Sequence, residues 1–583
     1  MKRITIHLFS ALLTAALISL WVPGHSVKAV EPPNLQMAVM SDVHINSKDL
    51  NSHFKQALTD LSRIAPNYDT IAIVGDMTDT GVESDYQSFK QILNAYKNPS
   101  AEQILSMGNH EYFESYIDKN STVTDEMLQA RFMNDSDESL SSIYYDKWIK
   151  GYHFISLAGE RSPRSLLNYE SMYPGAKDWA YISDQQYQWL EQTLAINASS
   201  NKPIFVFLHQ PITNTVYGSI NWGAGFDSER LLAILQKYPQ VILFSGHSHY
   251  LLDHPKSIYQ DGFTMVNTSS VDYTWYEGGW VPNHSQGFLV NVYNNRVELK
   301  GREFSNGTWI RTATIPIPYR EPAKDTTTPS YTGNSGLAVS ASCTLSWNQA
   351  EDNTVVDRYV IKEAGQVIRT IYSPFWEPEE KVSVTLNNLA PDSTHLYEVY
   401  AMDAYENQST TPIKITVTTK PPIGWYQKDH TWYYYTTEGI KQTGWLPDKN
   451  HWYYFDSTGA MKTGWVFING RWYDFDTNGV MKTGWVTENN VWYYLESSGA
   501  MKTGWLFTAN KWYFLDTSGA MKTGWLFNKN YWYYLESSGA MKIGWLSLGN
   551  QWYYLKTDGT MATNWNSIAG NWYYFMSNGV WKP

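Results

Sequence analysis

The last part of the chain repeats with a fixed period, and no other feature constrains the fold as strongly. From residue 424 onward a Trp recurs every 20 residues, preceded by Gly in seven units and by Asn in the eighth. A Trp-Tyr pair follows each of these Trp residues after seven positions, and a Gly follows after seven more. Each unit is predicted to be a β-hairpin, which cannot bury its apolar face alone, so the hairpins must stack. Residues 424–583 are therefore predicted to form a β-hairpin solenoid.

The two Trp residues of each unit are more than a thin solenoid can easily bury. Their rings either fill the core or, where exposed rings face one another, form cages that hold a quaternary ammonium group by cation–π attraction. The pattern Thr-Gly-Trp-x6-Trp-Tyr-Tyr-x4-Gly-x-Met-Lys resembles choline-binding, or cell-wall-binding, repeats. The resemblance implies cages between successive hairpins. The expected cage residues are Trp445, Trp452, Trp465, Trp472, Trp485, Trp492, Trp505, Trp512, Trp525, Trp532, Trp545 and Trp552.

The ligand that this resemblance implies is a choline-bearing teichoic acid, or another wall polymer, at a Gram-positive bacterial surface. Related repeats in glucan-binding proteins hold polysaccharide instead, so choline and glucan both stay open as ligands. Several weak cages would add their affinities by multivalency. The last unit departs from the pattern at Ala562 and Asn564, and we expect it to be a cap.

Residues 331–420 lie before the repeats and show short alternating strands without a helical pattern, which is typical of a small β-sandwich. A linker with Pro and a Thr run, residues 321–330, precedes them. Trp347, Tyr359 and the alternating run that begins at Tyr397 resemble a fibronectin type III module. The spacing from its Leu-x-Pro to that Tyr is about two residues longer here. We expect this module to be a spacer.

Residues 31–320 alternate apolar runs with polar, periodic stretches. The apolar runs are short and bounded by Gly, Asn, Asp or His, which predicts buried strands at 36–40, 70–74, 103–107, 203–208 and 240–244. Helices are predicted near 50–64, after Glu83, and over 184–195 with Ser183 as the N-cap. This alternation predicts an α/β domain.

Polar side chains follow each of the five predicted strands. They are Asp42 and His44, then Asp76 and Asp79, then Asn109, His110 and Glu111, then His209, and finally His247 and His249. Because open α/β sheets bind ligands beyond the carboxyl ends of their strands, we expect these side chains to converge. Imidazole and carboxylate ligands suit Zn, Mn and Fe. In Asp-x-His and His-x-His, both side chains point the same way if the backbone is extended. Glycines at 75, 108 and 246 would let the backbone turn close to the cluster.

The order Asp-x-His, Gly-Asp-x-x-Asp, Gly-Asn-His-Glu, His, Gly-His-x-His resembles the calcineurin-like metallophosphoesterase superfamily over about residues 35–270. The resemblance implies a four-layer αββα sandwich with two divalent transition-metal ions. It assigns Asp42, His44 and His249 to the first ion, Asn109, His209 and His247 to the second, and Asp76 to both. It gives His110 a role at the leaving oxygen without binding metal, whereas Asp79 and Glu111 would orient ligands.

The reaction that this superfamily implies is hydrolysis of a phosphoester by a hydroxide that bridges the two ions, with His110 as general acid. Thr80 and Gly81 follow Asp79, where protein serine/threonine phosphatases usually carry Arg, so the segment resembles cyclic-nucleotide-type phosphodiesterases more closely. The expected substrate is therefore a phosphodiester, for example of a wall polymer, with extracellular nucleotides as the alternative.

Two further questions stay open. The first is whether the chain is instead a wall-binding adhesin or scaffold with an inactive phosphoesterase domain, although no expected ligand is replaced. The second is whether the insert at residues 112–147 covers the site or is an ordinary surface excursion.

The N-terminus predicts export. Lys2 and Arg3 precede an apolar run, and small residues before a cleavage site after Ala29 indicate a signal peptide over residues 1–29, with no membrane span after cleavage. The net charge of −12 argues against nucleic-acid binding. Cys343 is the one cysteine, so no intramolecular disulfide is expected. The predicted product is a secreted, wall-associated protein with domains at 31–320, 331–420 and 424–583.

Overall fold

The computed structural model describes residues 31–46, 52–117, 121–136, 140–170, 175, 178–225, 227–333, 336–339 and 343–583. The predicted signal peptide, residues 1–29, lies outside this part. Contacts divide the chain into two compact units: Met1–Leu337, Ser346–Ser383 and Tyr397–Ile415 form the first, and Ala338–Leu345, Val384–Leu396 and Thr416–Pro583 form the second. The predicted domain boundaries stay predictions. Within the described residues, no helix is long and apolar enough to cross a membrane.

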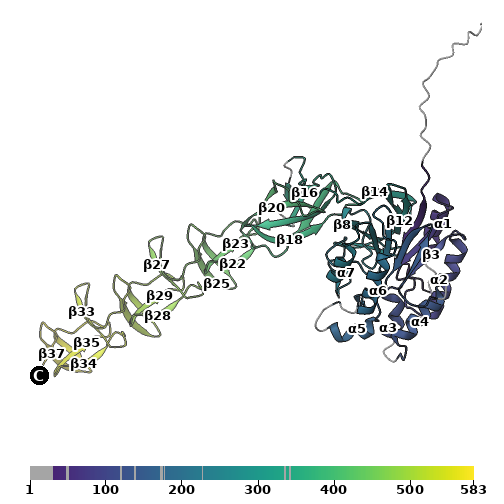
Figure 1. The fold of residues 1–583 in the computed structure, drawn as a ribbon. Coiled ribbons are helices and arrows are strands. Elements are labelled where there is room, and N and C mark those ends of the chain that lie inside the picture. The colour runs from purple at the N-terminus through teal and green to yellow at the C-terminus, as the bar shows by residue number, and fades with distance from the viewer. Residues whose placement is uncertain are drawn as a thin grey trace, which may run out of the picture. The chain divides into compact units, whose positions relative to one another are not determined.

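Two six-stranded sheets form the core of the N-terminal domain (Figure 1). The first has the order β14-β13-β12-β1-β2-β3, in which β1, β2 and β3 are parallel. Its strands are β1 (Leu35–Met40), β2 (Thr70–Val74), β3 (Glu102–Ser106), β12 (Gln286–Val292), β13 (Arg296–Glu303) and β14 (Thr308–Pro316). The second has the order β4-β5-β6-β7-β9-β8 with a parallel centre. Its strands are β4 (Tyr145–Ile149), β5 (Tyr152–Ser156), β6 (Ile204–Phe207), β7 (Val241–Ser245), β8 (Ile258–Gln260) and β9 (Thr264–Asn267).

Helices cover the outer face of each sheet. A cluster that includes Phe54 and Phe89 joins the first sheet to α1 (Ser52–Ile64), α2 (Glu83–Tyr96) and α4 (Asp125–Asp135). Another joins the second sheet to α6 (Asp184–Ala195) and α7 (Ser228–Leu235). A third lies between the two sheets. All residues of β2, β6 and β7 are buried, since both faces of these strands are covered.

This arrangement confirms the expected αββα sandwich. The predicted strands agree with β1, β2, β3, β6 and β7 to within two residues at each end. The predicted helix at 184–195 is α6, and the Ser183 side chain accepts a hydrogen bond from the Gln186 amide as its N-cap. The short helices α3 (Phe113–Ile117) and α5 (Pro163–Glu170) and the hairpin of β10 (Thr274–Tyr276) and β11 (Gly279–Val281) lie outside the two sheets.

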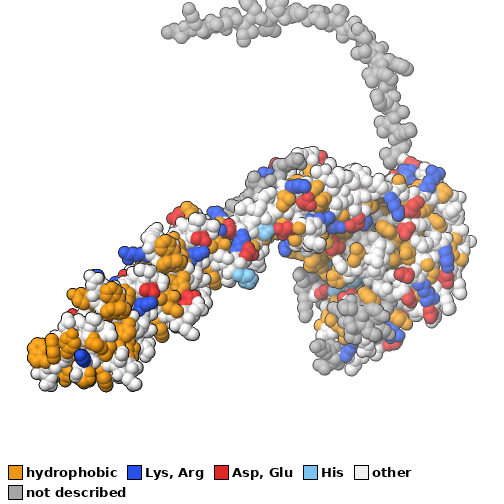
Figure 2. Space-filling view, turned by 90° about the vertical axis from the view of Figure 1, so that its left-hand side faces the viewer, with side chains coloured by type: hydrophobic (Ala, Val, Ile, Leu, Met, Phe, Trp, Pro, Cys, Tyr) orange, Lys and Arg blue, Asp and Glu red, His pale blue; other side chains and the backbone are white. Residues whose placement is uncertain are grey.

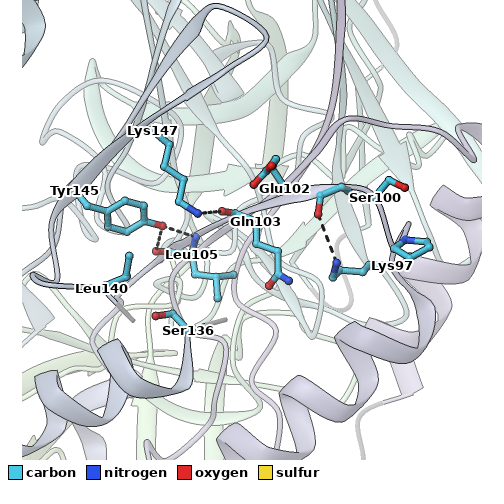
Figure 3. Close-up of a pocket in the computed structure, with 11 residues that line it drawn as sticks. Lys97, Ser100, Glu102, Gln103, Leu105, Ser136, Leu140, Tyr145 and Lys147 are labelled. Atoms are coloured by element: carbon cyan, nitrogen blue, oxygen red, sulfur yellow. Dashed lines mark hydrogen bonds between the residues drawn. The ribbon is translucent and has the colours of Figure 1, made fainter. Parts of the chain in front are cut away.

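Side chains of β4 close the edge of β3 (Figure 3). The Tyr145 hydroxyl accepts a hydrogen bond from the Leu105 amide at 2.9 Å and donates to the Leu105 carbonyl at 3.0 Å. Lys147 Nζ donates to the Gln103 carbonyl at 3.3 Å. These bonds satisfy backbone groups that an edge strand would otherwise expose. A cavity of about 300 Å³ lies beside these bonds, and Gln103, Leu105, Tyr145 and Lys147 are among its lining residues.

Two further sheets follow the linker, with orders β15-β16-β19 and β18-β17-β20-β21. Their strands are β15 (Gly336–Val339), β16 (Thr344–Asn348), β17 (Val356–Glu363), β18 (Gln366–Tyr372), β19 (Lys381–Thr385), β20 (Thr394–Asp403) and β21 (Ile413–Thr418). The buried rings of Trp347 and Tyr359 meet with centroids 5.4 Å apart. The resemblance to a fibronectin type III module stays a prediction.

Eight hairpins form the C-terminal part, from β22 (Gly424–Lys428) and β23 (Thr431–Tyr435) to β36 (Asn564–Ile568) and β37 (Asn571–Phe575), with β38 (Trp581–Lys582) added to the last. The strands between are β24 (Gly444–Asp448), β25 (His451–Phe455), β26 (Gly464–Ile468), β27 (Arg471–Phe475), β28 (Gly484–Glu488), β29 (Val491–Leu495), β30 (Gly504–Thr508), β31 (Lys511–Leu515), β32 (Gly524–Asn528), β33 (Tyr531–Leu535), β34 (Gly544–Leu548) and β35 (Gln551–Leu555). Successive units are linked; the Met481 amide, for example, donates to the Trp452 carbonyl at 2.8 Å. The stacked hairpins confirm the predicted solenoid.

Candidate metal centre

The loops after β1, β2, β3, β6 and β7 bring seven polar side chains into one cluster. These are Asp42, His44, Asp76, Asn109, His209, His247 and His249, all at most 8% exposed. The strands come from both sheets, so neither sheet alone could build the cluster. All seven residues that the sequence predicted as metal ligands are thus brought together.

The backbone at these loops differs from the extended form considered for Asp-x-His and His-x-His. Asp42 and His44 have φ of 53° and 47°, and His247 and His249 have φ of 65° and 58°. These values lie in the left-handed region, which residues other than Gly seldom adopt. Sharp turns rather than pleated strands therefore aim the side chains. Such strain is typical of functional sites, where the surrounding fold enforces it.

The candidate ligand atoms of this cluster form adjoining groups. The first contains Asp42, His44, Asp76 and His249, the second contains Asp76, His209 and His247, and a third contains His44, Asp79 and His110; in each, these atoms lie within 4.8 Å of one another. In the first group, the Nε2 atoms of His44 and His249 are 3.3 Å apart. In the second, His209 Nε2 is 3.0 Å from Asp76 Oδ2. The first two groups share Asp76, and the assignment of these residues to two ions stays a prediction.

Hydrogen bonds outside the cluster fix the imidazole rings. His209 Nδ1 is 2.7 Å from the Val74 carbonyl, and His249 Nδ1 is 3.1 Å from the Tyr273 carbonyl. A carbonyl only accepts, so each Nδ1 carries a proton and each Nε2 faces the carboxylates. A lone pair facing a carboxylate oxygen requires a cation between them, either a proton or a metal ion.

The electrostatics of the cluster support the same conclusion. Burial lowers the pKa of His209, but the carboxylates of Asp76 and Asp42 outweigh burial and raise this pKa to about 10. Burial raises the pKa of Asp76, but His209 and His110 outweigh it and hold this pKa well below its usual range. Among the described residues, His209 Nε2, His247 Nε2 and Asn109 Oδ1 are buried without a hydrogen-bond partner. Ionised carboxylates and unpartnered N and O donors fit divalent transition metals.

Glu111 holds the loops that carry Asp76 and Asn109. Its carboxylate accepts hydrogen bonds from the amides of Asp76 at 2.9 Å, Thr78 at 3.1 Å and Gly108 at 2.8 Å. Burial raises the pKa of Glu111 to about 7, and the nearby Asp76 adds to this effect. The predicted orienting role of Glu111 therefore has a geometric basis.

Asp79 contacts His110 through its backbone and lies near two His rings through its side chain. Its carbonyl lies 2.7 Å from His110 Nδ1. Its carboxylate accepts from Asn46 at 3.0 Å and lies 3.8 Å from His110 Nδ1 and 3.9 Å from His44 Nδ1. The His110 ring stacks on Phe113 with centroids 3.8 Å apart. His110 Nε2 is 4.0 Å from Asp76 Oδ2 and lines the pocket beside the cluster.

The predicted glycines bring backbone against the cluster. A Cβ on Gly108 would lie 2.2 Å from Asp76 Oδ1, and one on Gly246 would lie 2.3 Å from Asp42 Oδ2. Gly75 has φ of +82°, and its Cβ would lie 2.4 Å from His209 Nδ1. A side chain at any of these positions would therefore push a predicted ligand away.

A pocket of about 260 Å³ opens beside the cluster. Trp222, Tyr250, Tyr273, Trp275 and Asp178 line it, and the motifs at the strand ends did not predict any of them. These five residues lie in connecting loops or in β10, where no sequence periodicity marks them. Within the 112–147 insert, Phe113 is the described residue that lines this pocket, while α4 packs against the first sheet.

In the repeats, the predicted cage residues form rows of indole rings. Trp485 and Trp492 lie edge to face at 6.2 Å between ring centroids. Four other repeats show the same contact at 6.2 to 6.3 Å: Trp445 with Trp452, Trp505 with Trp512, Trp525 with Trp532, and Trp545 with Trp552. Each first Trp also meets a Tyr of the next unit, as Trp445 meets Tyr473 at 4.9 Å. The second Trp is 40% exposed or more, for example Trp492 at 45%. Hydrophobic side chains accordingly gather along the repeats on the face drawn in Figure 2.

Two parts of the sequence match known protein families. Residues 35–251 match the family of calcineurin-like phosphoesterases. Residues 423–463, 462–505 and 502–544 match the choline-binding repeat, and residues 543–561 and 563–580 match a cell wall binding repeat.

Three relatives show the extent of these similarities. A glycerophosphodiester phosphodiesterase of Enterobacter lignolyticus is 25% identical over 226 residues, 37% of this chain and 71% of the relative. A 3',5'-cyclic-nucleotide phosphodiesterase of Nostoc sp. is 22% identical over 323 residues, 51% of this chain and 98% of the relative. The crystal structure of choline binding protein F from Streptococcus pneumoniae is 32% identical, with 39% of this chain and 70% of that chain covered and a TM-score of 0.26.

The family of each part is assigned from the sequence matches, because a TM-score of 0.26 does not show a shared fold. Residues 35–251 are therefore a calcineurin-like phosphoesterase domain, and choline-binding repeats form the C-terminal part of the chain.

Proposed function

We propose that the protein is a secreted, cell-wall-attached phosphodiesterase that uses two divalent metal ions. The observation that carries this proposal is the convergence of the expected ligands: six lie in two groups that share Asp76, and Asn109 lines the adjoining pocket with its Oδ1 buried and unpartnered. Asp42, His44, Asp76 and His249 would hold one ion, and Asp76, Asn109, His209 and His247 the other. When bound, such ions act as Lewis acids that polarise phosphoryl oxygens and lower the pKa of water.

His110 supplies the proton for the leaving group in this proposal. Its Nδ1 proton is committed to the Asp79 carbonyl, so Nε2 is the atom that faces the pocket. In this proposal, a proton carried on Nε2, which lies 4.0 Å from Asp76 Oδ2, passes to the alkoxide oxygen as the P–O bond breaks. Phe113 stacks on the ring and the Asp79 carbonyl accepts from Nδ1, so both hold the ring in this orientation.

A diester fits the pocket better than a phosphoprotein. The described lining of the pocket contains no Lys or Arg, which commonly bind the extra negative charge of a monoester dianion. The two phosphodiesterase relatives support the same preference. An extracellular nucleotide phosphohydrolase is the second candidate, supported by the cyclic-nucleotide relative. An inactive wall-binding adhesin is disfavoured because all seven ligands are in place.

The repeats would hold the enzyme at the wall. Rows of partly exposed indole rings match what binding of quaternary ammonium groups requires, and weak sites in several units add by multivalency. A choline-bearing teichoic acid is therefore the proposed anchor, and a wall phosphodiester near it the proposed substrate.

The decisive experiment is hydrolysis of bis-p-nitrophenyl phosphate by the full chain after metal removal, with Mn²⁺ or Zn²⁺ added back. We expect turnover to require metal and to fall by at least about 100-fold in Asp76→Asn, which removes the shared ligand. Glu102→Gln, at the exposed start of β3, is the matched control and should keep full activity. Turnover that persists without metal and in Asp76→Asn would exclude the proposed mechanism.

A further inference from the structure

The pocket beside the metal centre is walled by aromatic rings that water still reaches. Trp222 and Trp275 both line it and are 43% and 39% exposed. Tyr250 and Tyr273 add two more rings. Indole rings left in water at the mouth of a concave site are the surface that a ligand usually covers.

These rings lie next to the predicted metal ligands. The Trp222 ring meets the His247 ring edge to face, with centroids 5.8 Å apart. The Trp275 amide donates to the His249 carbonyl at 2.9 Å. The Tyr273 ring lies 4.3 Å from the ring of His249. A phosphate held by the cluster would therefore place its neighbouring ester group against this aromatic wall.

The lining also contains an acidic side chain, Asp178, and its described residues include no Lys or Arg. Outside the lining, the Glu277 carboxylate lies 3.4 Å from Asn221 Nδ2, one residue before Trp222. A positively charged group is attracted by carboxylates and by ring faces. A quaternary ammonium group fits best, because it has no N–H that would require a hydrogen-bond acceptor.

We propose that the active-site pocket selects phosphodiesters with a quaternary ammonium group of the choline type, held by Trp222 and Trp275. This inference rests on the proposed function and adds its substrate class. The oxygen of one water forms a new P–O bond, the P–O bond to the leaving group breaks, and the leaving alkoxide takes up a proton to become the alcohol. The catalytic domain and the repeats would then recognise the same chemical group with separate sets of rings.

The test compares two esters that differ only in charge. p-Nitrophenyl phosphorylcholine carries the trimethylammonium group, and p-nitrophenyl 3,3-dimethylbutyl phosphate replaces its nitrogen by carbon. With the metal-loaded full chain, we expect kcat/KM to favour the choline ester by about tenfold or more. Trp222→Leu and Trp275→Leu should each lower this ratio by about three- to tenfold, mainly through KM. Trp222→Phe, which keeps a ring face, should give an intermediate ratio.

Trp280→Leu is the matched control. Trp280 faces Trp275 across the hairpin and is 59% exposed, but it does not line the pocket, so the ratio should stay at the wild-type value. Equal kcat/KM for the two esters would overturn the inference while leaving the phosphodiesterase intact. Loss of metal-dependent turnover on both esters and on bis-p-nitrophenyl phosphate would instead overturn the proposed function.

Two natural sources of the choline group can then be separated. Glycerophosphocholine represents a free lipid-derived diester, and purified choline-bearing teichoic acid represents the wall. Turnover of either supports the inference and identifies the source. Turnover of neither, or faster turnover of 3',5'-cyclic AMP than of every choline ester, would contradict it and favour stacking of a nucleobase on the same rings.

Discussion

The Nε2 atom of His249 lies 3.0 Å from Oδ1 of Asp42, although the two residues follow strands of different sheets. Asp42 follows β1 of the first sheet, and His249 follows β7 of the second. The centre therefore joins the two halves of the sandwich. A metal ion held here would stabilise the contact between the sheets as well as support catalysis.

Metal binding is accordingly expected to raise the melting temperature. A ligand at 100 times its Kd stabilises the folded state by about 2.7 kcal/mol. Thermal unfolding should therefore shift upward by several degrees with Mn²⁺ and return with a chelator. Asp42→Asn should abolish this metal-dependent shift. Glu191→Gln, at an exposed position of α6, should show the same shift as the wild type. A wild-type melting temperature that does not change when metal is added would contradict this prediction.

Gly108→Ala should remove activity without unfolding the protein. Its Cβ would lie 2.2 Å from Asp76 Oδ1 and 2.6 Å from the Asp76 amide nitrogen, so the shared ligand must move. We expect kcat/KM on bis-p-nitrophenyl phosphate to fall at least about 100-fold, since displaced ligands are costly in metal sites. Gly301→Ala is the control, because its nearest neighbour would lie at 3.5 Å. Unchanged metal content and activity in Gly108→Ala would argue against Asp76 as a ligand.

Breaking the buried ion pair between Asp60 and Arg302 should strongly lower the domain's free energy of unfolding. Its bonds are 2.6 and 2.9 Å long, and the two side chains are 8% and 3% exposed. Asp60→Ala leaves the Arg302 charge buried without its partner, which costs about 3 to 5 kcal/mol. Urea unfolding measures this loss. In the exposed pair of Glu191 and Lys237, Glu191→Ala should cost less than about 1 kcal/mol. Equal losses in the two variants would contradict this account.

His284 and Glu303 predict a pH dependence of stability. His284 Nδ1 lies 2.8 Å from Glu303 Oε2, and this hydrogen bond raises the pKa of His284. The raised folded-state pKa means that the pair stabilises fully below the unfolded value of about 6.5 and loses this contribution as pH rises through the folded pKa. The free energy of unfolding lost in His284→Gln should therefore shrink between pH 6 and pH 9. A loss that is independent of pH would indicate a packing effect alone.

Removing one exposed indole from the repeats should weaken binding of the full chain to a choline-type resin. Trp492 is 45% exposed and meets Trp485, so Trp492→Ala should lower the choline concentration needed for elution. The effect should be partial, because the remaining cages still bind. Tyr531→Ala, at an exposed ring outside the predicted cages, should elute like the wild type. Identical elution of both variants would favour a structural role for Trp492.

Much of the fold could be predicted because its strands are buried on both faces. The run at 70–74 is apolar at each position, and it became β2 with each residue buried. The cap at Ser183 could be predicted because N-capping depends on neighbouring residues only. The solenoid followed from its 20-residue period. The left-handed backbone at Asp42 and His247 could not be predicted, since the surrounding fold imposes that strain.

The sequence by itself determined which residues can bind metal, because their types and their places after strands are local properties. It also determined the repeats, because their 20-residue period is visible in the sequence. The tertiary structure decided how the candidate ligands group around Asp76, and that the Asp79 carbonyl contacts His110. It alone placed Trp222 and Trp275 in the pocket beside the cluster. Both residues reach the centre from segments without a motif, and only the packing of two sheets brings such segments to one place.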